Sequence, residues 1–144
     1  MNKTAIWGLA VILAAVMGAA PAAAYPSQAS NEAGIQPVSW DAWLAAKAKA
    51  EKHDAEGNLV AALQYYLEYV RQARALNSPV RLAWGLNNTA YMIIKMHRQD
   101  PTVDLEPARK LLEDGLAIPE ASEDCRKIMA MNLEHVRSRL ERAR

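Results

Sequence analysis

The sequence predicts an all-α domain, and three observations support this prediction. Apolar residues recur at three- and four-residue steps from about residue 39 to the end of the chain, which is the period of an amphipathic helix. No segment alternates apolar and polar residues with the period of two that a half-buried strand requires. Gly, Asn, Ser and Pro interrupt the helical pattern and divide it into about five helices. The connections between them are short, so neighbouring helices are expected to run antiparallel.

The first helix is expected to begin after Ser39 and to end before Gly57. A serine hydroxyl can accept a hydrogen bond from a free backbone N–H at a helix start, and glycine readily takes the left-handed conformation that ends many helices. The predicted apolar face contains Trp40, Trp43 and Leu44. Alanines cover much of the remaining surface, so a neighbouring helix could approach this one closely.

The second helix is expected over about residues 59–76, and the third from Pro79 to about His97. Ser78 is the predicted N-cap of the third helix, and proline is favoured at the first helical position because it needs no hydrogen-bond acceptor there. The apolar face of the second helix is predicted to consist of Leu59, Leu63, Tyr66, Leu67, Val70 and Ala73. The inward residues of the third are predicted to be Leu82, Leu86, Ala90, Ile93 and Ile94.

The fourth helix is expected to begin near Asp104 and to end near Ile118, with Pro107 tolerated in its first turn. Ser122 is the predicted N-cap of the fifth helix. Several arginines lie near the end of the fifth helix, where cations interact favourably with the helix dipole. Its predicted apolar residues are Ile128, Met129, Leu133, Val136 and Leu140.

Residues 1–24 have the layout of a secretory signal peptide. Lys3 precedes an apolar run from Ala5 to Met17, and small residues occupy the positions before a predicted cut after Ala24. The alternative is a retained membrane anchor, but the run falls short of the about 20 residues that a spanning helix needs. We therefore expect an exported protein, periplasmic or secreted, with no membrane span after cleavage.

Residues 25–38 contain two prolines among small and polar residues and are expected to form a flexible lead. The helical domain would then occupy residues 39–144. The whole chain has 17 Lys and Arg against 16 Asp and Glu, and loss of Lys3 with the signal would balance the two counts. A balanced charge gives no global attraction to nucleic acid or anionic lipid, so no nucleic-acid partner is expected.

Reactive and metal-binding residues are sparse. Cys125 is the only cysteine, so an exported chain has no internal disulfide, and this residue is expected to pack against other helices. The alternative is a disulfide between two chains. His53, His97 and His135 lack a second His or Cys at metal-ligand spacing on the same helix. No phosphate-binding loop or nucleophile motif is present, so we expect no metal, no cofactor and no enzyme activity.

Two segments look like one structural part used twice. Residues 57–66 and 104–112 each place a small alanine, Ala62 or Ala108, between bulky apolar neighbours, and each follows another predicted helix. A repeated helical hairpin is typical of solenoid proteins. The two alanines are 46 residues apart, which exceeds the about 34 residues of the commonest helical-hairpin unit.

With these features the chain resembles the tetratricopeptide repeat family, whose unit is a helix–turn–helix with small residues where helices cross. The matching positions are Ala50, Gly57, Leu59, Ala62 and Tyr66 in the first hairpin and Ala90, Ala108 and Gly115 in the second. The resemblance covers residues 39 to about 120. It implies a right-handed α-solenoid fragment of about two repeats, with the fifth helix as a cap.

The resemblance also implies a concave groove, lined by the first helix of each repeat, in which a peptide binds. The candidate groove residues are Lys47, Glu51, Trp84, Asn87, Tyr91, Lys95, Lys127 and Met131, with Leu44 beside them. Aromatic rings supply contact area, an amide can pair with a peptide backbone, and Lys95 can pair with a carboxylate. The alternative is that Trp84 and Tyr91 pack against the neighbouring hairpin.

The expected function is therefore a non-enzymatic module of the cell envelope that binds a protein or peptide. The alternative is a self-associating structural component, that is, a homo-oligomer. Trp40 and Trp43 lie near the predicted open end of the solenoid, where they would either cover its apolar edge or contact another copy. Tyr65, Tyr66 and Tyr69 are expected to pack in the core.

Overall fold

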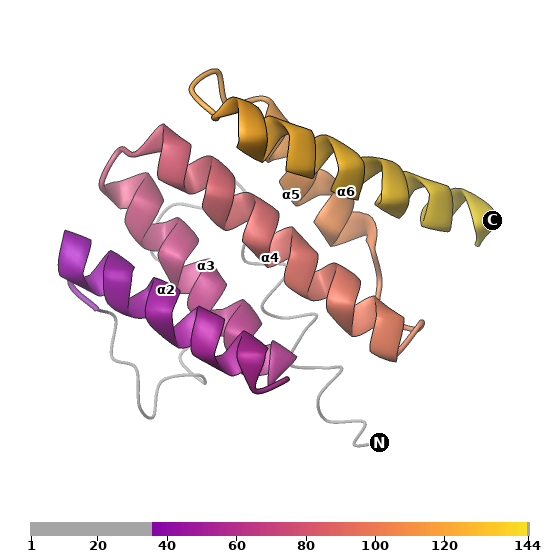
Figure 1. Ribbon diagram of the computed structural model, residues 1–144, viewed down its shortest axis with the longest axis horizontal. Coiled ribbons are helices and arrows are strands. Elements are labelled where there is room, and N and C mark those ends of the chain that lie inside the picture. The colour runs from indigo at the N-terminus through magenta and orange to yellow at the C-terminus, as the bar shows by residue number, and fades with distance from the viewer. Residues whose placement is uncertain (1–35, 144) are drawn as a thin grey trace.

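The computed structural model describes residues 36–143, and these form only α-helices, without a strand (Figure 1). The helices are α2 (Trp40–Ala55), α3 (Leu59–Ala75), α4 (Pro79–Gln99), α5 (Glu106–Leu116) and α6 (Glu123–Arg142). The all-α prediction is confirmed for this part of the chain. The expected signal peptide and most of the expected lead lie outside the described residues, as does Arg144. Within 36–143, no helix combines the length and the apolar character needed to cross a membrane.

The helices form two layers. Each helix packs against the next one in the chain, and α4 also packs against α6, whereas the backbone of α2 packs only against α3. Figure 1 shows α2, α4 and α6 in front of α3 and α5. Consecutive helices run in opposite directions, so the three front helices run the same way. The central position of α4 leaves it one exposed side, which faces the front.

The first two turns use the same backbone device. Gly57 has φ 74° and Asn77 has φ 50°, the left-handed conformation that glycine and asparagine tolerate best. After α2, the N–H groups of Gly57 and Asn58 donate to the carbonyls of Asp54 and His53 at 3.0 and 2.9 Å. Asn77 and Ser78 repeat this pattern after α3. Both helices therefore end in a Schellman motif, as expected from residues that break the helical pattern here.

All three predicted N-cap positions are confirmed, and two of them have a side-chain capping bond. The hydroxyls of Ser39 and Ser122 accept from the N–H groups of Ala42 and Cys125 at 3.0 and 3.3 Å. Ser78 occupies the N-cap position of α4, but its side chain makes no capping bond. Its Oγ accepts instead from Nη1 of Arg81 at 3.3 Å, because the arginine one turn later competes for it.

Most predicted core residues are buried. Leu67 of α3, Leu82 of α4 and Leu140 of α6 are half-buried and pack on the core. Ile128 of α6 is exposed, so its predicted burial is wrong. Trp40 and Leu44 of α2 are exposed as well. The buried residues of α2 are Trp43, Ala46 and Ala50. Since α2 contacts a single helix, one narrow side is covered, and that side is centred on alanines.

A fully buried glutamine fastens the start of α2 to α3. Gln72 accepts from the N–H of Ser39 at 3.1 Å and donates to the carbonyl of Pro37 at 3.1 Å and to Glu68 at 2.9 Å. Arg71 donates to the carbonyl of Gln36 at 2.6 Å. The last residues of the expected lead are thus hydrogen-bonded to α3. The helical pattern of the sequence did not single out Gln72 for this role.

The packing roles predicted for the tyrosines and the cysteine are largely confirmed. Tyr66 and Tyr69 are buried, and burial is the main cause that raises the pKa of each to about 12. Tyr65 is half-buried and stacks on the ring of His53, with centroids 5.4 Å apart. Cys125 is fully buried, and burial raises the pKa of its thiol.

Candidate functional site

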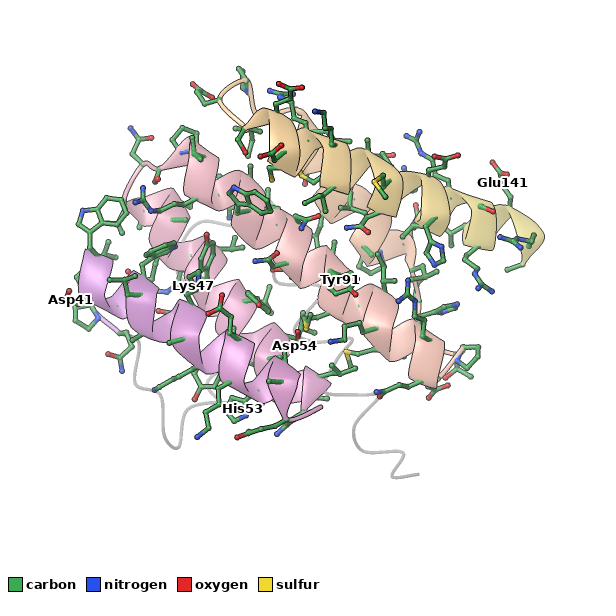
Figure 2. All side chains as sticks on the ribbon, in the orientation of Figure 1. Asp41, Lys47, His53, Asp54, Tyr91 and Glu141 are labelled. Carbon is green, nitrogen blue, oxygen red and sulfur yellow. The ribbon has the colours of Figure 1, made fainter. Side chains whose placement is uncertain are left out.

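The exposed side of α4 carries three of the candidate groove residues. Trp84, Tyr91 and Lys95 are spaced by seven and four residues, which places them on one side of a helix. Tyr91 is 37% exposed and points outward from α4 (Figure 2). Trp84 is half-buried and packs against the core. Tyr91 is therefore available to a partner, while Trp84 serves packing and exposes only part of its ring.

An ion pair joins this side of α4 to α2. Nζ of Lys95 contacts the carboxylate of Asp54, and both side chains are partly buried. The same ammonium lies 5.7 Å from the ring centroid of Tyr91, a distance at which the ring face attracts a cation. Asp54 was missing from the predicted groove because its partner is 41 residues away.

The candidate residues of α2 lie on the same side as Asp54. Lys47, Glu51 and Asp54 follow steps of four and three residues, and Lys47 donates to Glu51 at 2.6 Å. We use the term front face for the surface made by Lys47, Glu51, Asp54, Trp84, Tyr91 and Lys95. Apart from Trp84, it combines one accessible aromatic ring with two ion pairs.

Asn87 lies elsewhere, in the contact between α4 and α6. Its side chain is only 4% exposed. Its Oδ1 accepts from Nδ2 of Asn132 at 3.0 Å, and its Nδ2 donates to Oδ1 of Asn88 at 3.3 Å. Both ends of the amide are thus used within the molecule, so Asn87 holds α6 against α4 and is not exposed to a peptide.

The candidate residues on α6 are the most exposed. Met131 is 70% exposed and lines a shallow hollow of about 350 Å³ with Glu134, His135 and Ser138. Lys127 pairs with Glu123 at 2.8 Å on a highly exposed part of α6. Ile128, which was predicted to be buried, lies one turn before Asn132 and is exposed. It extends the apolar surface beside the front face.

The charged groups that lower the pKa of His135 are cations. Partial burial is the main cause that lowers the pKa of its imidazole, and the positive charges of Arg98, Arg139, Arg142 and His97 lower it further. Arg98 and His97 belong to the end of α4, and the other two follow His135 on α6. The neutral imidazole is therefore favoured in the folded protein.

The structure offers no visible centre for metal or covalent chemistry among the described residues. Within that part of the chain, no three His, Cys, Asp or Glu side chains gather as a metal site would require. His97 lies with Nδ1 2.8 Å from the carbonyl of Val103, and the ring of His53 stacks on Tyr65. The only thiol, Cys125, is buried.

Comparisons of the chain with models of protein families, with curated proteins and with solved structures found no significant match. The geometry of the front face is thus the basis on which a function is argued.

Proposed function

We propose that this chain is a non-enzymatic module that binds a short peptide segment of a partner protein on the front face. The observation that carries the proposal is Tyr91, an accessible aromatic ring on the one exposed side of the central helix. Rings of this kind contribute strongly to binding because they bury a large area at a small entropic cost.

The arrangement of the helices supports a binding surface of the tetratricopeptide type. The first helix of each hairpin, α2 or α4, lies in the front layer with α6 (Figure 1). Ala50 and Ala62, the small residues of the first hairpin, are fully buried, which permits the close crossing of α2 and α3. The turn between these helices uses the left-handed Gly57. A repeat of this kind presents its first helices to the ligand.

The polar groups of the front face suit an extended peptide. Lys95 and Asp54 are paired with each other in the free protein. A peptide whose carbonyl accepts from Lys95 while its N–H donates to Asp54 leaves neither charge without a partner. Lys47 and Glu51 form a similar exposed pair. The apolar side chains Ile128 and Met131 on α6 extend the contact area.

The proposal also includes export of this chain to the cell envelope. The layout of residues 1–24 favours delivery through a secretory route to the cell envelope. A binding module with a single, buried thiol suits such a compartment, because it depends on no reduced cysteine at its surface.

Selection from a displayed library of random peptides, with the purified chain as bait, tests the proposal. Fluorescence polarisation then gives the affinity of an enriched peptide for variants of the chain. We expect Tyr91→Ala to weaken binding about tenfold or more, as loss of a central aromatic contact does. Lys95→Gln should weaken it less, and Lys110→Gln on α5 is the matched control, because it removes an exposed, ion-paired lysine from the rear layer.

The position of the bound peptide provides the second readout. Amide chemical-shift changes should concentrate on α2, α4 and α6. Shifts confined to α3 and α5, or equal affinities for the Tyr91→Ala variant and the original chain, would show that the front face is not the binding surface. A library from which nothing is enriched would count against peptide binding altogether.

A further inference from the structure

Helix α2 has a second exposed side that no other helix covers. Its backbone packs only against α3, through Trp43, Ala46 and Ala50. From α4, only the side chains of Lys95 and Arg81 are recorded in polar or ring contact with it. The opposite side of α2 is exposed to solvent. We use the term outer face for the residues on that side: Asp41, Leu44, Ala45, Ala48 and Lys52. Leu44 lies three and seven residues before Lys47 and Glu51, so the outer face adjoins the front face along one edge.

The outer face is apolar at its middle. Leu44 is 53% exposed, and the exposed Ala45 and Ala48 adjoin it along the helix. Val38, which precedes α2, is also an exposed apolar residue. A helix with apolar residues on two opposite sides is expected to be covered on both sides, and the described chain covers only one.

The charges on the outer face are arranged so that those of one copy complement those of a second copy. Asp41 and Lys52 flank Ala45 and Ala48 at equal separations of four residues. If two copies of α2 pair antiparallel, Asp41 of each copy lies opposite Lys52 of the other, and Ala45 lies opposite Ala48. A parallel pairing would instead place like charges together.

The local ion pairs leave these charges available. Asp41 forms no ion pair within the described residues, and Lys52 approaches Glu56 only at 3.9 Å with its side chain 71% exposed. Lys47 and Glu51, by contrast, are already paired at 2.6 Å.

We propose that the outer face of α2 binds the outer face of a second copy of this chain, in an antiparallel two-fold symmetric dimer. The two-fold axis passes between the helices near Ala46 and Lys47, and the interface is isologous. The alanines at the centre let the two backbones approach closely, and two Asp41–Lys52 pairs set the register. One helix pair buries less than the about 1,000 Å² of a stable interface, so the dimer is weak and depends on concentration.

The dimer has a consequence for binding. A two-fold symmetric dimer carries two front faces, one in each copy. A partner with two peptide segments could then bind both copies at once, and its avidity would exceed the affinity of one site.

Charge reversal tests the register. In sedimentation velocity over a concentration series, the purified chain should shift from monomer to dimer. Asp41→Lys and Lys52→Asp should each weaken the dimer roughly tenfold, because each creates two like-charge contacts. The double variant with both substitutions should recover the original affinity within about threefold. Lys110→Asp on α5 is the matched control and should leave dimerisation unchanged, while circular dichroism verifies that each variant is helical.

Disulfide trapping gives a readout that keeps every charge in place. A mixture of Ala45→Cys and Ala48→Cys chains should cross-link faster between unlike chains than either variant does with itself. Cys125 is fully buried and does not compete. A monomer at every concentration, a dimer unaffected by single reversals, or trapping that prefers like chains would each overturn the proposal. None of these outcomes bears on peptide binding by the front face.

Discussion

The two ends of the helical array differ in what they show to solvent. Helix α2 forms one end and contains six alanines in 16 residues, whereas α6 forms the other and contains one alanine in 20. The outer face of α2 has Leu44 and alanines at its centre. Much of the exposed surface of α6 consists of charged residues, among them Lys127, Glu134 and Arg137.

The two end helices also differ in how many neighbouring helices hold them in place. Helix α2 is held by α3 alone, while α6 contacts both α5 and α4 and adds the amide pair of Asn87 and Asn132. A short array of helical hairpins needs a polar outer surface at each end to remain unassociated. The exposed surface of α6 is mostly charged, although Ile128 and Met131 are also exposed, whereas the outer face of α2 is apolar at its middle. This difference is the reason why we propose a second copy as the partner of α2.

The largest expected effect is on the free energy of unfolding, and it distinguishes the buried side of α6 from its exposed side. Met129 is fully buried and Met131 is 70% exposed. Met129→Ala should lower the free energy of unfolding by about 3 kcal/mol, because it leaves a cavity between α5 and α6. Met131→Ala should change it by about 0.5 kcal/mol or less. Urea denaturation measures both, and similar losses at the two sites would mean that α6 is packed differently.

The next largest effect is a difference in stability between alanine substitutions at two helix crossings, α3–α4 and α5–α6. A Cβ on Gly85 of α4 would lie 2.5 Å from the ring of Tyr69 and 2.8 Å from Val70, whereas one on Gly115 of α5 would meet mainly the sulfur of Met129, at 2.6 Å. The ring is fixed in the core, but the thioether can turn. Gly85→Ala should destabilise the protein by about 2 kcal/mol.

At Gly115→Ala the helix-forming advantage of alanine, about 1 kcal/mol, should offset the smaller clash and leave stability nearly unchanged. Thermal unfolding of the two variants side by side measures the difference. Equal destabilisation would show that the α5–α6 crossing is as rigid as the α3–α4 crossing.

The smallest effect is a dependence on pH at the α6 end. The pKa of His135 is lowered below its ordinary value of about 6.5 by burial and by neighbouring cations. The unfolded chain therefore takes up the proton first as pH falls, so stability should decrease from about pH 6.5 down through the lowered pKa. Because the imidazole is only partly buried, the change should be small.

The matched variant isolates this effect. Denaturation of the original chain and of His135→Gln on either side of pH 6.5 should show a steeper loss at low pH for the original chain. Protonation of carboxylates at still lower pH destabilises both chains, so that effect cancels when the two are compared. Parallel pH profiles would mean that the cations around His135 do not act on it.

The sequence predicted the helices well because the signals for their ends are local. The hydroxyls of Ser39 and Ser122 meet backbone N–H groups three residues away, and Gly57 and Asn77 end their helices by their own backbone conformation. Burial on α3 was also predictable, since neighbours on both sides produce a broad apolar stripe. These features depend on residues within one or two turns.

The candidate site was only partly predictable from the sequence. Spacing placed Trp84, Tyr91 and Lys95 on one side of α4, because that relation is local. It could not assign Asn87, which lies toward α6 and bonds to Asn132, 45 residues away. It also missed Asp54, the partner of Lys95, for the same reason.

The sequence by itself thus determined the number of helices in the described region, most of their ends and the identity of most core residues. Only the tertiary structure decided which side of α2 is covered, which polar groups pair across helices, and which end of the array stays apolar. The physical reason is that periodicity shows that a helix has an apolar side, while the width and direction of the covered side depend on how many neighbours it has. Helix α2 has one such neighbour, so Leu44 stays exposed although its spacing fits a core position.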